Sequence, residues 1–486
     1  MQIDTAVLPP PASAARLREI ADLPGPRGLP ILGNLHQVDL PRVHQTVERW
    51  SREYGPYFRF KLGDRAFVAV ADHDALHQVL RDRPDGFRRT AKLQAIWAEL
   101  GLPSGVFGAE GEAWQRQRRM VMAGFDPSHV RAYFPSLMKV TQRLQGRWQK
   151  AARSGEWIDL QADLMRFTVD AITGLAFGAD LNTLESDDVV IQRHLDKIFP
   201  TIFKRVLSQV PYWRYFKLPK DRDVERSVVE VKRAIAAFVA QARERMRADP
   251  NLHVQPSNLL EAMIAAADTD GSGLDDEDVA GNVLTMLLAG EDTTAHTLAW
   301  MIHLLHDNPA ALARARAEVR SVAPDLAAFS PEQMRDLDFV EACANETMRL
   351  KPVAPFFAVQ ALRDTVIADI RVPTGTLIWA AFRVDSVSDK HFPNAAAFDP
   401  QRWLAGGPDA PAPTSSAKRV SMPFGAGPRV CPGRYLALLE MKMVMATLLG
   451  QFEIDRVETK DGAPVQEHLA FTMAPMGLRM RLRERA

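Results

Sequence analysis

The stretch FGAGPRVCPG, Phe424 to Gly433, places one of the chain's only two cysteines among three glycines and two prolines. Glycine lets the main chain come close to a large flat ligand. A helix beginning at Pro432 would aim its free N–H groups and positive dipole end at the Cys431 sulfur, which favours the thiolate over the thiol. These are the conditions that a thiolate metal ligand needs. Taken alone, a single cysteine is more often a small buried hydrophobe in a tight turn.

The composition of the chain excludes several classes of protein. The 486 residues carry 60 Lys plus Arg and 60 Asp plus Glu, so the formal net charge is zero, and nothing favours nucleic-acid binding. Cys343 and Cys431 form no CxxC pair, which argues against a disulfide framework or a usual zinc site and favours a reducing compartment. The first residues show neither a signal peptide nor a transmembrane anchor, so we expect a cytoplasmic protein.

Hydrophobic periodicity predicts a mainly α protein with a minor β part. Apolar residues at three- and four-residue spacing predict a helix over Val224–Ala248. Tyr57–Asp72 reads as a hairpin, and the Pro- and Gly-rich run Leu23–Leu35 as an extended segment laid over a folded body. Strand-like pieces return late in the chain, at Thr365–Phe382 and Leu469–Leu482.

A second candidate site lies within Met286–Leu305. The pattern predicts a helix of roughly thirty residues that enters through an acidic cap at Asp275 to Asp278 and ends before Pro309. Its middle is polar: Gly290 leaves room for a ligand or water, and Asp292 and Thr293 offer a carboxylate and a hydroxyl side by side. The alternative is that the hydroxyl bonds back to its own helix and the carboxylate reaches solvent.

Two further pairs share helical faces. Glu346 and Arg349 are three residues apart, so they can pair on the helix that Ser330 caps. Trp114 and Arg118 are four apart and project together. By itself, each pair is also compatible with an ordinary amphipathic helix.

Together, these pieces resemble the cytochrome P-450 family, and the resemblance covers essentially the whole chain. The matching motifs are FxxGxRxCxG at Phe424–Gly433, [AG]Gx[DE]T[TS] at Ala289–Thr294, ExxR at Glu346–Arg349, FDPQRW at Phe398–Trp403 and WxxxR at Trp114–Arg118. The LPGP leader is similar to that of the PGP-leader branch. The resemblance implies a triangular helical body, a long central helix over the haem and a small β-rich region. It also implies a single haem-thiolate monooxygenase domain over 23–486, preceded by an extension over 1–22, with no fused reductase.

The resemblance assigns roles to individual residues. Cys431 would be the metal ligand, and haem would be bound by Trp114, Arg118, Ala289, Phe424, Gly425, Arg429 and Gly433. The catalytic residues would be Gly290, Glu291, Asp292 and Thr293, and the structural triad would be Glu346, Arg349 and Arg402. His296 would pack or hydrogen-bond at the helix surface. Many family members place an Arg for a haem propionate near Val359 or Gln360, so that contact has no candidate.

The implied reaction inserts one oxygen atom of O2 into a hydrophobic small molecule, such as a fatty acid, terpenoid, steroid or aromatic compound. The cofactor would be heme b (iron protoporphyrin IX). Electrons from NAD(P)H would arrive indirectly, through a ferredoxin or flavodoxin with its reductase. The alternatives are a peroxygenase or hydroperoxide isomerase of the same fold, or a non-catalytic haem sensor or carrier. The Asp292–Thr293 pair favours the monooxygenase.

Three weaker expectations concern the surroundings of this site. Substrate contacts map onto Phe87–Phe107, Ile198–Phe216, Pro355–Val359 and the region of Met473. Basic residues that would dock an acidic redox partner, or simply be solvated, are Arg116, Arg119, Lys418, Arg419 and Arg434. The loop from Asp268 resembles the start of a calcium loop, but Val279 stands where a Glu ligand is needed, which favours a solvated loop capping the next helix.

Overall fold

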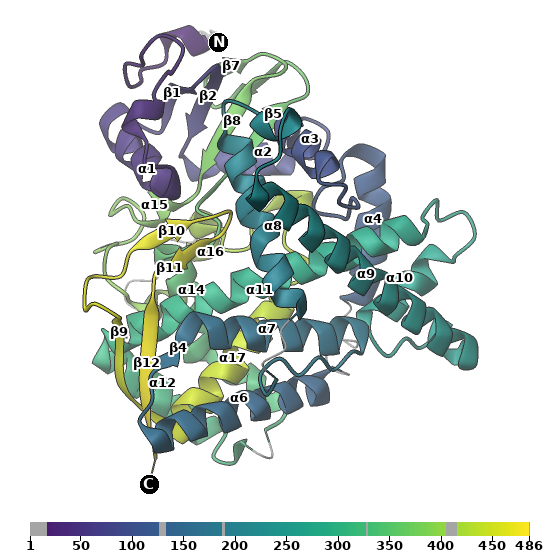
Figure 1. The fold of residues 1–486 in the computed structure, drawn as a ribbon. Helices are drawn as coiled ribbons and strands as arrows, with labels where there is room; N and C mark the ends of the chain where they lie inside the picture. The colour runs from purple at the N-terminus through teal and green to yellow at the C-terminus, as the bar shows by residue number, and fades with distance from the viewer. Residues whose placement is uncertain (1–16, 126–132, 187–189, 327–328, 405–415, 486) are drawn as a thin grey trace, which may run out of the picture.

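The computed structural model describes residues 17–125, 133–186, 190–326, 329–404 and 416–485 (Figure 1). Its α-helices are α1 Val43–Tyr54, α2 His73–Arg81, α3 Ala91–Glu99, α4 Gly111–Gly124, α6 Phe134–Ser154, α7 Leu160–Phe177, α8 Val190–Leu207, α9 Pro219–Ala248, α10 Leu259–Ala267, α11 Asp276–His306, α12 Pro309–Val322, α13 Pro331–Arg335, α14 Asp338–Leu350, α15 Arg383–Ser386, α16 Ala417–Ser421 and α17 Arg434–Gln451. Its strands are β1 Tyr57–Leu62, β2 Arg65–Val70, β3 Phe87–Arg89, β4 Ile158–Asp159, β5 Phe356–Ala361, β6 Thr365–Ile367, β7 Ile370–Val372, β8 Leu377–Ala381, β9 Phe452–Thr459, β10 Glu467–Leu469, β11 Met473–Pro475 and β12 Leu478–Glu484. The expected class, mainly α with a minor β part, is confirmed.

The largest sheet joins strands from residues 57–89 with strands from residues 356–381. Its strand order is β1-β2-β8-β5-β3, with β2 and β8 parallel and the other neighbours antiparallel. The predicted hairpin is present, with Tyr57 opposite Val70 and Leu62 opposite Arg65. Figure 1 shows this sheet at one end of the molecule, with most of the helices and the strands β9 to β12 in the remainder.

The Pro- and Gly-rich segment lies over β1, as expected. The Arg59 N–H donates to the Pro24 carbonyl at 2.9 Å. A Cβ on Gly25 would lie 1.9 Å from the Arg59 carbonyl oxygen, so only glycine allows this approach. Part of the expected extension is also attached, because Arg18 forms an ion pair with Asp369 at 2.7 Å.

Helix α11 runs through the centre of the molecule. It begins at Asp276, where the Asp275 side chain accepts from the N–H groups of Glu277 and Asp278 at 2.9 and 3.0 Å, and it ends at His306. Its residues belong to the two largest hydrophobic clusters, one with α6, α14 and α17 and the other with α8, α9 and α10. The calcium-like loop is the loop before this cap, and its Asp268 pairs with Arg243 at 3.1 Å.

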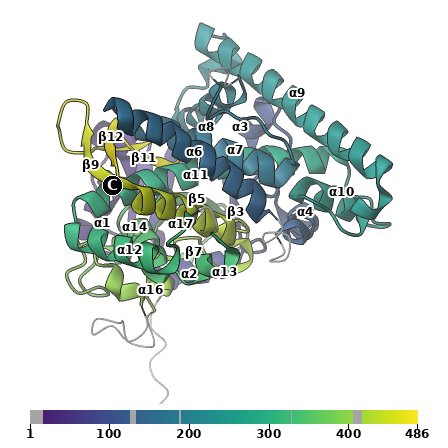
Figure 2. The same ribbon diagram turned by 90° about the horizontal axis from the view of Figure 1, so that it is seen from below.

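Two helix boundaries differ from the sequence interpretation. The helix that Ser330 caps ends at Arg335, and the Glu346–Arg349 motif lies on a separate helix, α14, that begins at Asp338. Helix α17 begins at Arg434 with Gly433 as its N-cap, two residues later than predicted, because Val430 is extended and Pro432 disfavours helical backbone at the residue before it. Figure 2 shows α17 running beneath α11.

The described helices also answer the question of membrane crossing. Within residues 17–485, excluding the gaps given above, no helix combines the length and apolar character that a bilayer span requires.

Candidate active site

The Cys431 loop is closed by its own backbone. The Cys431 N–H donates to the Phe424 carbonyl at 3.0 Å. Gly427 has a φ of 71°, and a Cβ there would lie 2.4 Å from the Leu80 carbonyl oxygen of α2. Gly425 has a φ of 73°, and a Cβ there would meet no atom within 4 Å. Both glycines therefore occupy left-handed backbone that other residues rarely adopt, and open space lies beside Gly425.

Burial and the neighbouring polar groups have opposite effects on the pKa of the Cys431 thiol. Burial raises the pKa of the Cys431 thiol, while the Gly433 N–H and the Arg118 and Arg434 cations lower it. A metal cation at the sulfur would add a much larger favourable charge and deprotonate a coordinating thiol outright. The loop is therefore suited to binding a metal through sulfur.

Three arginines surround a single carboxylate beside this loop. Arg429 contacts Glu110 at 2.5 Å and donates to the Ala109 carbonyl at 2.7 Å. Arg83 lies 3.9 Å from the same carboxylate. Arg89 donates its backbone N–H to Glu110 at 2.9 Å, while its guanidinium donates to the Phe107 carbonyl at 2.5 Å and stacks on the Phe107 ring at 3.6 Å. Burial lowers the pKa of Arg83 to about 10 and also lowers that of Arg89. One carboxylate leaves N–H groups of the buried cations Arg83 and Arg429 unsatisfied.

These features fit a flat, anionic ligand. Among the described residues, Arg83 Nε and Nη2 and Arg429 Nε are buried without hydrogen-bond partners. Ala289 is exposed, although it lies in the middle of the otherwise buried helix α11. Haem, with two carboxylates on a flat ring, would pair the cations and cover this surface. The residues present therefore fit haem.

Trp114 and Arg118 project together from α4, as their spacing predicts. Arg118 Nη2 donates to the Val430 carbonyl at 2.8 Å, and the Arg429 guanidinium carbon lies 4.7 Å from the Trp114 ring centre. Both side chains thus hold the Cys431 loop. Arg83 and Arg89 were not identified from the sequence, because their approach to Glu110 depends on how α2, β3 and α4 pack together.

The polar patch of α11 is more tightly bonded than the sequence suggests. Thr293 Oγ1 donates to the Ala289 carbonyl of its own helix at 2.7 Å, which is the alternative noted above. Asp292 does not simply reach solvent, because it accepts from Thr472 at 3.3 Å. The Thr472 hydroxyl also lies 3.4 Å from Nδ1 of the buried His296.

Gly290 allows two helices to pack closely. A Cβ at Gly290 would lie 3.2 Å from the Ile172 side chain of α7. The glycine therefore lets α7 approach α11, and its expected role beside a ligand or water stays a prediction. A further buried acid, Glu440 of α17, accepts from Thr294 of α11, and burial raises the pKa of Glu440 to about 8.

The expected Glu-Arg pair is present and buried. Arg349 donates to both oxygens of Glu346 at 2.7 Å, and both side chains are 0% exposed. Arg402 Nε lies 3.5 Å from Glu346, and Trp403 Nε1 donates to the same carboxylate at 2.9 Å. Arg349 also donates to the carbonyls of Ser386, Ala395 and Ala397, so it anchors the segment after α15.

Three of the segments expected to contact substrate converge in an aromatic cluster. Phe199 of α8 stacks on Phe471 with ring centres 4.2 Å apart, and Phe107 lies 5.9 Å from Phe471. Phe471 has a φ of 102°, a conformation that costs free energy in a non-glycine residue. The cluster joins segments that are far apart in the sequence.

A separate group of ligating side chains is best explained by hydrogen bonding. His73, Asp385 and His391 bring their polar atoms within 4.8 Å of one another. Asp385 Oδ2 already accepts from the His73 N–H at 2.9 Å and from His73 Nδ1 at 2.8 Å. Two ligands of one tetrahedral zinc ion lie about 3.3 Å apart, so this contact has hydrogen-bond length instead.

The fold and the site together fit the class of haem-thiolate proteins: a helical body holds a cysteine just before a helix N-terminus, arginines with unsatisfied N–H groups and a polar central helix. Comparison with known proteins agrees. The Cytochrome P450 family model matches residues 23–481, so the chain belongs to the cytochrome P450 family.

Curated relatives and a solved structure extend this result. The chain is 28% identical over 482 residues to self-sufficient cytochrome P450 monooxygenase CYP505U2 of Exserohilum turcicum, spanning 96% of this chain but 42% of that protein. It is 28% identical over 466 residues to carotene epsilon-monooxygenase of Arabidopsis thaliana, spanning 92% of this chain and 80% of that one. The crystal structure of the cytochrome P450DA heme domain superposes with a TM-score of 0.83 at 22% identity, covering 97% of this chain and 99% of that one.

Family membership makes the protein an oxidoreductase of the P450 type. It implies haem and O2, electrons that derive from NAD(P)H, a hydrophobic substrate and a redox partner. The functions of the individual site residues are matters for proposal.

Proposed function

We propose that this protein is a haem-thiolate monooxygenase that binds heme b through Cys431 and inserts one oxygen atom of O2 into a hydrophobic substrate. The observation that carries the proposal is the Cys431 sulfur itself, which accepts from the Gly433 N–H beside Arg118 and Arg434. Bound haem would supply oxygen activation, with thiolate electron density favouring O–O cleavage.

The chain's own residues would hold the haem, relay protons and exclude water. Arg118, Arg429 and Trp114 would hold the haem carboxylates, with Arg83 and Arg89 taking the place of the propionate contact that has no candidate near Val359. Asp292 would relay protons from solvent, and Thr293 would turn its hydroxyl from the Ala289 carbonyl toward the reacting oxygen. The aromatic cluster of Phe107, Phe199 and Phe471 would exclude water.

Apolar and aromatic surfaces support a hydrophobic substrate. A largely apolar pocket with few polar groups is typical of sites for such ligands. The relative named carotene epsilon-monooxygenase carries a terpenoid hydrocarbon in its name, which supports the terpenoid class among the fatty acids, steroids and aromatic compounds considered.

A substrate screen tests the proposed function. Terpenoids, fatty acids, steroids and aromatic compounds would be added to the purified holoprotein, and a shift of the haem Soret band would report binding. Each positive compound would then be incubated with O2, NAD(P)H and a ferredoxin or flavodoxin system, or with hydrogen peroxide alone. Product formed only with the reductase system is the expected result. Product from peroxide alone would identify a peroxygenase, and binding without product would identify a sensor or carrier.

We expect Thr293→Ala to uncouple reductant consumption from product formation. Loss of the hydroxyl should lower the product formed per NAD(P)H by about tenfold or more, because proton transfer by a positioned group contributes about 10²–10⁴-fold to a rate. Thr297→Ala is the matched control, since Thr297 makes the same back-bond one turn later, to the Thr293 carbonyl at 2.8 Å, but is buried. Equal coupling in the two variants would remove Thr293 from the proposed role.

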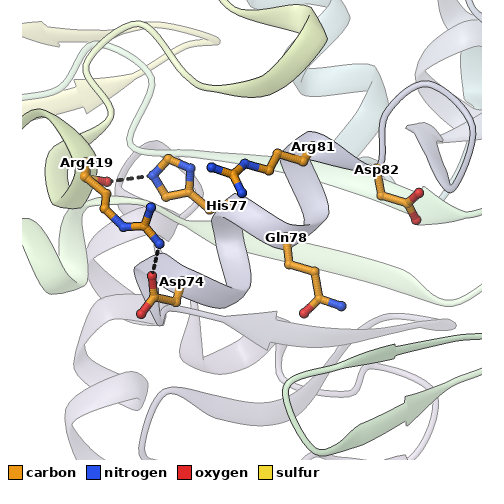
Figure 3. A pocket seen from close by; sticks show the side chains of 6 residues that line it. All are labelled: Asp74, His77, Gln78, Arg81, Asp82 and Arg419. Atoms are coloured by element: carbon orange, nitrogen blue, oxygen red, sulfur yellow. Dashed lines mark hydrogen bonds and ion pairs between the residues drawn. The ribbon is translucent and has the colours of Figure 1, made fainter. Parts of the chain in front are cut away.

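We further propose that electrons arrive at the face formed by α2, α16 and the Cys431 loop, from a ferredoxin or flavodoxin. A pocket of about 600 Å³ lies on this face. Figure 3 shows the side chains of α2, its following residue Asp82 and Arg419 that line it. Arg419 there is already engaged by Asp74, at 2.6 Å, so it carries less free charge than expected. Lys418 and Arg119 are exposed, and no ion pair engages them within the described ranges. A second candidate donor is suggested by the relatives named self-sufficient, of which this chain spans less than half.

We expect Lys418→Glu and Arg119→Glu each to slow electron transfer at low ionic strength by about tenfold, because rim charges act mainly on association rate. Arg247→Glu is the control, since Arg247 is exposed on α9, where it pairs with Glu244. Stopped-flow reduction of the haem at increasing salt measures the effect. Rates that do not depend on salt in the unmodified protein would contradict docking by charge.

We also propose a cytoplasmic location. Both cysteines are free, and Cys343 is buried, as suits a reducing compartment. Two relatives carry the word chloroplastic in their names, so fractionation of the source cells should compare these compartments.

A further inference from the structure

Two carboxyl groups meet between α8 and α11. Glu291, which precedes Asp292 on α11, is 2% exposed, and it hydrogen-bonds to Asp196 of α8. Asp196 is reached by solvent, at the edge of a pocket of about 680 Å³ whose lining also includes Met165, Gln192, Lys460 and Asp461. The contact therefore joins a solvent-filled pocket to a buried acid beside the polar patch of α11.

A hydrogen bond between two carboxyl groups requires one proton between them. Two carboxylates in contact cannot both ionise without strong repulsion, and their protons are lost in steps that belong to the pair. The second oxygen of Glu291, Oε1, is buried and has no hydrogen-bond partner within the described part of the chain. That oxygen is therefore free to accept a hydrogen bond or a proton.

The surrounding charges keep this proton in place. Burial first, and then the charges of Asp196 and Asp292, raise the pKa of Glu291 well above its ordinary value. Burial first, and then the charge of Asp292, raise the pKa of Asp196 to about 7, although the hydrogen bond with Glu291 and the charge of Lys197 oppose them. Lys460 and Asp461 face the pocket from the loop after β9, and they bring opposite charges. The pair is therefore poised to gain and lose a proton near neutral pH.

We propose that Asp196 and Glu291 share a proton and form the route by which protons pass from the pocket between α7, α8 and the β9–β10 loop to Asp292. This proposal rests on the monooxygenase function proposed above. Asp196 would take a proton from pocket water as Glu291 releases one on its inner side, so charge and atoms balance without any further reactant. Asp292 would receive the proton at the carboxylate that already accepts from Thr472.

This route would also return a proton to the Asp292 carboxylate after Asp292 has passed one on. Glu291 and Asp292 are neighbours on one helix, so their side chains diverge by about a quarter turn. Glu291 therefore faces α8 while Asp292 faces Thr472. A water molecule between them would complete the path, since both acids act on each other electrostatically.

The first experiment follows the pair without reference to catalysis. A carboxyl whose pKa is raised in the folded protein keeps its proton after the unfolded chain has lost it, so stability falls as pH rises between the two pKa values. For Asp196 this window runs from about pH 4, its value in the unfolded chain, to about pH 7 in the folded protein. The thermal midpoint of the unmodified protein should therefore fall, relative to that of Asp196→Asn, as pH rises from 5 to 8. Midpoints that run parallel in the two proteins would overturn the proposal.

The second experiment measures the rate. Asp196→Asn and Glu291→Gln should each lower the rate of product formation by about tenfold or more, with KM little changed, and should enlarge the solvent deuterium isotope effect. Asp196→Glu should restore most of the rate. Asp461→Asn is the control, because Asp461 lines the same pocket but bonds within its own loop, to Thr459 at 2.9 Å. A change confined to KM, or failure of Asp196→Glu to restore the rate, would assign Asp196 to packing instead.

The two proposals can fail separately. Asp196 of α8 and Glu291 of α11 belong neither to the Cys431 loop nor to the arginines beside it, so these variants should keep the Soret band of the unmodified holoprotein. If the unmodified protein shows no thiolate-type spectrum, the proposed function fails, whereas a normal spectrum with unaltered proton dependence in both variants defeats only the proton route.

Discussion

Cys431→Ser is expected to abolish thiolate ligation and to lower product formation by more than about a hundredfold. Loss of an outer-shell partner of a metal ligand already costs about 10–100-fold in affinity or activity, and the ligand itself should cost more. A serine hydroxyl is a weaker donor and keeps its proton in the same buried loop. The reduced protein under carbon monoxide should lose its thiolate-type spectrum, and haem content should fall on dialysis.

Cys343→Ser is the matched control for this experiment, because it makes the same chemical change at the other cysteine. Cys343 is buried in α14 within the largest hydrophobic cluster, where burial raises its thiol pKa. That variant should bind haem with an unaltered spectrum, although its stability falls somewhat. A thiolate-type spectrum that persists in Cys431→Ser would remove the basis of the proposed function.

Arg349→Ala is expected to destabilise the protein by about 3–5 kcal/mol, because breaking a buried ion pair leaves an uncompensated charge inside. Here the loss is larger than a pair alone, since Arg349 also satisfies the carbonyls of Ser386, Ala395 and Ala397. The segment it anchors leads toward the Cys431 loop, so haem retention should also fall. Urea titration of the haem-free and haem-bound protein measures both effects.

Arg335→Ala on the neighbouring helix is the control. Arg335 and Glu332 have the same three-residue spacing, but their side chains are 67% and 60% exposed and lie 3.8 Å apart. Pairs of this kind contribute about 0.2–0.5 kcal/mol. Similar losses in the two variants would show that burial does not govern the Glu346–Arg349 pair.

Several features of the fold follow from the local sequence. The cap at Asp275 and the apolar pattern after it predict α11 closely, because capping and periodicity act within a few residues. The hairpin at Leu62-Gly63-Asp64 also depends on a few neighbouring residues. The boundary between α13 and α14 was not predicted, since the apolar and helix-forming residues run on through Leu337 without a proline or glycine to mark the break.

In the candidate site, too, some contacts follow from the local sequence and others depend on tertiary packing. Cys431, Thr293 and the Glu346–Arg349 pair lie in motifs whose internal spacing determines which groups can meet. The contact of Gly290 with Ile172 and the return of the Thr293 hydroxyl to Ala289 appear only with the neighbouring helices and the side-chain rotamers in place.

The sequence by itself determined the family, the cysteine proposed to bind haem and the central helix with its acid and alcohol, because each rests on motifs of neighbouring residues. Only the tertiary structure decided that the Arg83 and Arg429 cations meet at Glu110, and that Asp196 of α8 meets Glu291 of α11. The physical reason is the same in both cases. Charges on separate elements are brought together by the packing of those elements, and spacing along the chain carries no record of that packing.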